Sequence, residues 1–376
     1  MTASSTSKPP TIAYTRQRRV RGHARESTVD GTAEIASTAL ATPMDAGFRQ
    51  VPLSTIRSRY FISSKVFRVT VPPVARTPTG RRFQLAALLR HLREQRGLTQ
   101  EEVGGIIWPG TSPRSVQNKI TRLENGDGGI TKDDLHALLK VYGTTNGVAL
   151  ELALRLNSGT SQRGRWRGPR ATHPESFRQY VDLEEDARLI RLVAVEEIPD
   201  LLQCESYLRV RSPAEQNLAA IRDRQRVLFR EEPAEVYVVL SESCVRRIRG
   251  NALVMVEQID RLLRLSELPN VTLQLAPFDP PPGLPTNTTP ERFALLRLTA
   301  PGVIGEFRRH LDFAFTVVGG RLYPDDNIQS YEELWLNATV GALSPDSTRR
   351  FLREVRRGFR ERWPLDEGSG NDTGDD

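Results

Sequence analysis

The chain has 376 residues, a hydrophobic fraction of 38% and a formal net charge of +7. This length favours two or more domains, and two cysteines are too few for a disulfide framework and indicate a reducing compartment. The sequence has no signal peptide and no apolar run near the roughly 18 residues of a membrane helix. We therefore expect a cytoplasmic protein and neither a secreted nor a membrane one.

The positive charge is concentrated at the N-terminus. Residues 1–80 contain 12 Lys and Arg against 4 Asp and Glu, so the rest of the chain carries a net charge of −1. We predict that 1–80 is a disordered basic arm, because it offers little apolar surface to bury. Two interpretations stay open: a solvated tail, including a start at Met44, or an arm that follows phosphates or a minor groove with Arg16, Arg18, Arg19, Arg21 and Arg25.

Residues 81–156 show the pattern of five short helices. Leucines recur from Leu85 to Leu92 at helical spacing, and Gly97 ends that helix. Thr99 with Glu102 forms a capping box at the second helix, and Ser112–Pro113 opens the third. Later helices begin at Thr131 and near Gly147. The pattern predicts a compact all-α domain.

The remaining chain predicts a linker over 157–172, a mixed α+β domain over 173–361 and an acidic tail over 362–376. The fold class is therefore α+β overall, with disordered tails. Predicted helices cover 184–202, 213–230, 252–266, 331–342 and 346–359, and predicted strands cover 234–240, 271–276, 293–298 and 313–318.

The N-terminal helices resemble helix-turn-helix regulators of the Cro and phage-repressor type, also called the xenobiotic-response-element class. The resemblance lies in the leucine-rich first helix, in GLTQEEV at 97–103 and in TRLENG at 121–126. It implies double-stranded DNA as the partner. This chain departs from the family pattern, since the connection between the second and third helices is about six residues longer and the Gly104–Gly105 pair weakens the second helix.

The third helix is the predicted recognition helix. With Val116, Ile120 and Leu123 turned inward, its outer face is polar and suited to base edges and phosphates in the major groove. Gln100, in the first turn of the second helix, is placed to meet a phosphate. The predicted DNA-binding residues are Gln100, Arg114, Ser115, Gln117, Asn118, Lys119, Thr121 and Arg122.

The C-terminal region resembles an actinobacterial family that joins such a helix-turn-helix to an antitoxin-like domain of unknown function. The residues that carry this resemblance are in EEDA at 184–187, IPDLLQ at 198–203, LPNVTLQ at 268–274 and LSPD at 343–346. The resemblance implies a cytoplasmic, nucleoid-associated regulator, with a small partner protein bound by the C-terminal domain.

Catalytic motifs are lacking in the sequence. Ser241–Cys244 follows a predicted strand without a nucleophile elbow, and the five histidines show no metal-ligand spacing. We therefore expect no enzyme activity, cofactor or metal. The main hypothesis is a homodimeric, sequence-specific transcription regulator whose C-terminal domain mediates dimerisation and senses an effector or partner. The alternative is an antitoxin-like protein that chiefly binds a small partner protein, with DNA binding secondary or lost.

Overall fold

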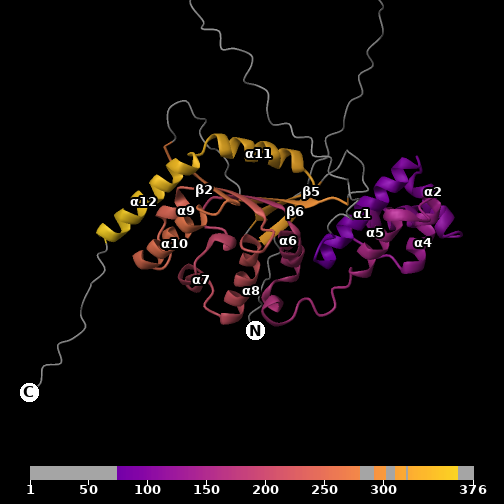
Figure 1. Ribbon diagram of the computed structural model, residues 1–376, viewed down its shortest axis with the longest axis horizontal. Helices are drawn as coiled ribbons and strands as arrows, with labels where there is room; N and C mark the ends of the chain where they lie inside the picture. The colour runs from indigo at the N-terminus through magenta and orange to yellow at the C-terminus, as the bar shows by residue number, and fades with distance from the viewer. Residues whose placement is uncertain (1–73, 280–291, 302–309, 319–320, 363–376) are drawn as a thin grey trace, which may run out of the picture. The chain divides into compact units, whose positions relative to one another are not determined.

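The computed structural model describes residues 74–279, 292–301, 310–318 and 321–362 (Figure 1). Nearly all of the predicted basic arm, and the acidic tail beyond Arg362, lie outside these ranges. The first described helix begins at Pro78, three residues before the predicted domain boundary. Within the described ranges, every helix is too short or too polar to cross a membrane.

The N-terminal domain contains the five predicted helices. Thr77, Thr99, Ser112 and Thr131 each cap a helix by accepting a hydrogen bond from a backbone N–H, which satisfies one of the unpaired donors of the first turn. The capping box between Thr99 and Glu102 is complete. The helices are α1 (Pro78–Gln95), α2 (Gln100–Ile107), α3 (Pro113–Glu124), α4 (Lys132–Val141) and α5 (Gly147–Ser158).

Leucines dominate the core of this domain. Leucines of α1, α4 and α5 form one buried cluster with Ile120 and Leu123 of α3, and the most buried of them are fully shielded from solvent. Burial of this apolar stripe stabilises helices that are individually too short to form in water. The cluster is centred on Leu88, Leu89, Val103, Ile120, Leu135, Leu138, Leu152 and Leu156.

The C-terminal domain is built on a six-stranded mixed sheet, in agreement with the predicted α+β fold. Its strand order is β3-β2-β1-β4-β5-β6. β1, β2 and β3 are parallel to one another, whereas the pairs β1–β4, β4–β5 and β5–β6 are antiparallel. The strands are β1 (Leu189–Ala194), β2 (Glu235–Ser241), β3 (Val271–Ala276), β4 (Phe293–Thr299), β5 (His310–Val318) and β6 (Arg321–Asp325).

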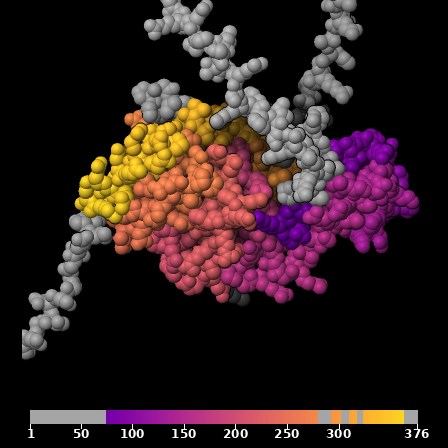
Figure 2. Space-filling view, in the orientation of Figure 1, coloured from indigo at the N-terminus to yellow at the C-terminus, as the bar shows by residue number. Residues whose placement is uncertain are grey.

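Helices cover both faces of the sheet. α6, α7, α10 and α12 pack against one apolar face, and α11 packs against the other, as Figure 1 shows. α12 lies at the surface, where its yellow atoms are visible in Figure 2. The helices are α6 (Glu175–Asp186), α7 (Glu205–Arg211), α8 (Glu215–Gln225), α9 (Ser243–Arg246), α10 (Ala252–Leu265), α11 (Ile328–Val340) and α12 (Pro345–Arg362), with short 3-10 helices η1 (Gly168–Thr172), η2 (Asp200–Leu202) and η3 (Arg226–Leu228).

The prediction of a helix over 184–202 is wrong, because this segment contains the central strand β1. Leu189, Leu192 and Val193 follow helical spacing by coincidence. β1 is hydrogen-bonded on both sides, and its two sheet faces are both covered, with Leu192 in one core and Val193 in the other. A strand buried on both faces is a continuous apolar run, which periodicity cannot distinguish from a buried helix.

The predicted linker is attached to the C-terminal domain. The Nε of Arg165 lies 2.5 Å from an oxygen of Asp182, and its Nη2 lies 2.8 Å from Glu185. Both acids belong to α6. The same helix holds the start of α1, because the Asp186 carboxylate accepts hydrogen bonds from the backbone N–H groups of Arg76 and Thr77. α6 is thus a shared anchor for the linker and the helix-turn-helix.

Candidate nucleic-acid interface

The recognition helix α3 packs against α2 at unusually short range. An ideal Cβ built on Gly104 would lie only 2.6 Å from Cβ of Val116, whereas a Cβ on Gly105 would have no atom within 4 Å. Gly104 therefore permits the close approach of the two helices, and Gly105 faces open space. The glycine pair predicted to weaken α2 has a packing role at its first position.

The connection between α2 and α3 is shorter than the resemblance to the regulator family predicted, which was about six residues more than usual. It comprises residues 108–112, between Ile107 and Pro113, and a usual helix-turn-helix has a turn of three or four residues. Trp108 anchors the connection to α4, because its Nε1 donates a 3.1 Å hydrogen bond to Asp134, and Lys119 lies 3.6 Å from the Trp108 ring centroid.

Four of the predicted DNA-binding side chains form the open outer face of α3. Each is exposed, and none makes a side-chain hydrogen bond or ion pair with any residue that the structure describes. Amide and guanidinium groups that are left without internal partners are free to bind base edges or phosphates. These four residues are Arg114, Gln117, Asn118 and Arg122.

Two further predicted residues are exposed but already engaged locally. The Ser115 hydroxyl lies 2.8 Å from the Ser112 hydroxyl at the N-cap of α3. Lys119 is paired weakly with Asp134 at 3.9 Å, with its side chain 55% exposed. An exposed pair at this distance contributes little stability, so the Lys119 ammonium remains available to a phosphate.

Gln100 and Thr121, the last two predicted residues, are half-buried and engaged with each other. They meet between α2 and α3, with the Thr121 hydroxyl 2.7 Å from Oε1 of Gln100. The Gln100 amide also donates to Glu124 at 2.9 Å. The side chain of Gln100 therefore joins α2 to α3, and sequence periodicity does not reveal this cross-helix contact.

Glu124 is the residue of this site that sequence reasoning missed. Its side chain is 1% exposed, and both carboxylate oxygens are held by Arg93 of α1, at 2.6 Å and 2.9 Å. This hydrogen-bonded pair raises the pKa of Arg93. Together with Gln100, the pair joins α1, α2 and α3, and a buried carboxylate is stable only with such partners. The only sequence signal was an acidic residue at the end of an otherwise basic helix.

The C-terminal cysteines and histidines show no comparable site. Among the described residues, no group of three or more His, Cys, Asp or Glu side chains could hold a metal ion. Cys244 is buried beside β1, and burial raises its pKa to about 12. The interface on α2 and α3 is therefore the candidate functional site.

Two segments of the chain match models of protein families. Residues 84–153 match a model of a helix-turn-helix domain, and residues 177–354 match a domain of unknown function, DUF5753. Neither the curated proteins nor the solved structures contain a match to the chain. The chain is thus similar to a helix-turn-helix domain in its N-terminal part, which supports DNA binding, and to DUF5753 in its C-terminal part.

Proposed function

We propose that the protein is a sequence-specific transcription regulator of the xenobiotic-response-element class, with α3 as its major-groove recognition helix. The observation that carries the proposal is the exposed face of Arg114, Gln117, Asn118 and Arg122, whose polar groups have no internal partners among the described residues. Gln and Asn pair with adenine and Arg with guanine in the major groove. We propose a binding role rather than a catalytic one.

Rigid support of α3 favours sequence recognition over loose electrostatic attachment. The helix is held at its C-terminal end by Arg90, whose Nη2 donates to the Glu124 carbonyl at 3.1 Å and to Asn125 at 2.8 Å. Its N-terminal half packs on Gly104. Base-specific hydrogen bonds require such preorganisation, because a side chain displaced by about 1 Å loses its bidentate geometry.

A gel-shift titration against the protein's own promoter region, repeated over a salt series, tests the proposal. Gln117→Ala and Arg122→Ala are each expected to weaken specific binding by about 1–3 kcal/mol, roughly 5- to 150-fold. Lys140→Ala is the control, because Lys140 is an exposed basic residue in the last turn of α4, outside α2 and α3. Full binding by both α3 variants would refute the site and favour the antitoxin-like alternative.

The oligomeric state forms part of the proposal. Palindromic half-sites are read by two-fold dimers, and α11 carries two exposed apolar side chains one helical turn apart, Leu336 at 62% and Val340 at 48%. We propose that this face contributes to a homodimer and that the C-terminal domain senses an effector or a small partner protein. Sedimentation of Leu336→Glu is expected to show a shift towards monomer, and an unchanged dimer would exclude this face.

A further inference from the structure

A cavity of about 720 Å³ lies beside the sheet of the C-terminal domain. Residues that follow β1, the first residues of β4 and one side of α6 line it. In the strand order, the chain proceeds from β1 outward to β3 and then returns past β1 to form β4. Ligands of open sheets bind outside the carboxyl ends of strands at the point where the chain changes direction in this way. This cavity has that position, although β4 is antiparallel.

One side of the cavity is aromatic and aliphatic. Phe177 and Tyr180 of α6 have stacked rings with centroids 5.3 Å apart, and Leu192 of β1 packs in the same core as these rings. A cavity of this volume and lining suits a small organic molecule with a ring system. The apolar side of the cavity thus predicts that the ligand contains a ring.

The opposite side is lined by arginines and carboxylates, most of which are paired with one another. Arg224 is fully engaged by Glu184, at 2.8 Å and 3.0 Å, and by Asp200 at 2.8 Å. Glu197 in turn is the carboxylate shared by three further guanidinium groups within 4.0 Å. These are Arg211, which also pairs with Asp200, together with Arg249 and Arg292. Of the charged side chains that line the cavity, three are arginines (Arg211, Arg224 and Arg292) and four are carboxylates (Glu175, Glu184, Glu197 and Asp200), so the charge preference depends on which groups are left unengaged.

Arg292 is the arginine with spare donors. It lines the cavity, its side chain is 32% exposed, and its ion pair with Glu197 spans 3.9 Å, with no hydrogen bond to any described residue. A cationic ligand would have to displace short internal ion pairs, whereas an anion would use donors that are not engaged. Glu175 also lies at the cavity, but it is solvent-exposed at the first turn of α6, where water screens its charge.

We propose that this cavity binds a small aromatic monoanion, with its ring against Phe177 and Leu192 and its charged group at Arg292. α6 connects the cavity to the DNA-binding domain, since Asp182 and Asp186 on the same helix hold the linker and the first residues of α1. A ligand that alters the position of α6 therefore alters the support of α1. This coupling rests on the proposed function, whereas binding in the cavity does not.

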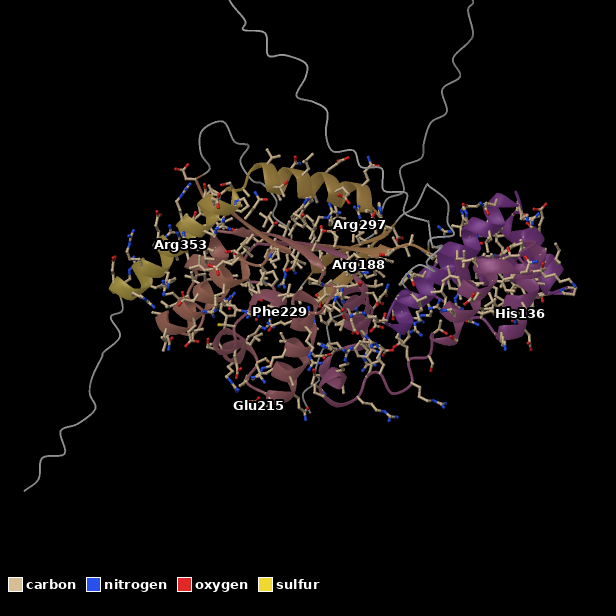
Figure 3. All side chains as sticks on the ribbon, viewed as in Figure 1. His136, Arg188, Glu215, Phe229, Arg297 and Arg353 are labelled. Atoms are coloured by element: carbon tan, nitrogen blue, oxygen red, sulfur yellow. The ribbon has the colours of Figure 1, made fainter. Side chains whose placement is uncertain are left out.

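Binding is tested on the full chain with 8-anilinonaphthalene-1-sulfonate, an aromatic monoanion, and with N-phenyl-1-naphthylamine, its uncharged analogue. We expect saturable, one-site fluorescence titrations for both. Arg292→Gln is expected to weaken binding of the sulfonate roughly tenfold, because it removes one hydrogen bond to a charged group. Binding of the neutral amine is expected to stay unchanged. Arg353→Gln is the matched control, because it removes the same charge from the exposed face of α12 (Figure 3).

A second variant tests the location of the site without disturbing the core. Ser176 is exposed and lines the cavity, so Ser176→Trp fills the opening and is expected to abolish binding of both molecules while the circular dichroism spectrum is retained. Sulfonate binding that is unsaturable, or unaffected by Arg292→Gln or by Ser176→Trp, overturns the proposal.

Coupling is measured separately by repeating the DNA titration with the sulfonate at saturation. A change in DNA affinity that Ser176→Trp removes supports control through α6. If the sulfonate binds in the cavity but DNA affinity is unchanged, the coupling is wrong while the cavity assignment stands. If no DNA binding occurs at all, the proposed function fails, and the fluorescence result still decides the ligand site.

Discussion

Replacement of Gly104 by alanine tests directly whether the helix-turn-helix depends on the close approach of α2 and α3. The new Cβ would lie 2.6 Å from Cβ of Val116, 3.0 Å from its Cγ2 and 3.3 Å from its backbone carbonyl carbon. Carbon atoms pack best at about 3.5–4.0 Å. Because backbone is among these contacts and Val116 is 1% exposed, a change of side-chain rotamer cannot remove the clash, and the helices must separate.

The expected cost follows from two opposing contributions. Overpacking a well-ordered core destabilises a protein by about 1–3 kcal/mol, and replacing a helical glycine by alanine stabilises it by about 1 kcal/mol. The difference between the two contributions leads us to expect that Gly104→Ala lowers the free energy of unfolding by up to about 2 kcal/mol. Gly105→Ala is the matched control, because its Cβ meets nothing within 4 Å, and it is expected to raise that free energy by about 0.5–1 kcal/mol.

Urea denaturation followed by circular dichroism measures both variants, and hydrogen exchange on peptides from 100–124 localises the effect. Gly104→Ala is also expected to weaken specific DNA binding, since the separation displaces α3 from its support. If the two alanine variants change the free energy of unfolding in the same direction by similar amounts, the packing role of Gly104 is refuted and only helix propensity remains.

Three other predictions concern single side chains. Burial, reinforced by the nearby Arg224 charge, lowers the pKa of His173 to about 4, so the neutral form stabilises the fold above the unfolded pKa of about 6.5, and this stability is lost as pH falls towards 4. Between pH 7 and pH 5 the free energy of unfolding is expected to fall by about 2 kcal/mol, which a shift of the urea midpoint measures. His173→Gln should remove this shift, and an equal shift in the variant would contradict the prediction. Glu124→Gln is expected to lower the free energy of unfolding by about 1–3 kcal/mol, because it removes the charge of the buried carboxylate that holds the half-buried Arg93. The exposed Glu101→Gln should change it by less than about 0.5 kcal/mol, and equal effects would argue against a stabilising pair. In a thiol-labelling time course, Cys204 should react before Cys244, whose pKa is raised by burial, and the reverse order would disprove this assignment.

Local chemistry made the N-terminal domain predictable from sequence. Helix caps act within four residues, so the capping box at Thr99 and the Ser112–Pro113 start are readable without the fold, and the structure confirms both. The amphipathic spacing of α3 likewise identified its buried residues, Val116, Ile120 and Leu123. These patterns depend on neighbours along the chain, which the sequence contains in full.

Tertiary structure decided the features that depend on residues far apart in the chain. The Gln100 side chain joins Glu124 and Thr121 instead of facing solvent, and β1 is a strand because sheet partners on both sides cover it. Periodicity records how residues repeat along one segment and contains no information on which other segment covers it. The sequence alone therefore determined the type of the DNA-binding domain and its outward helix, while packing between elements decided which of those polar side chains remain free to bind.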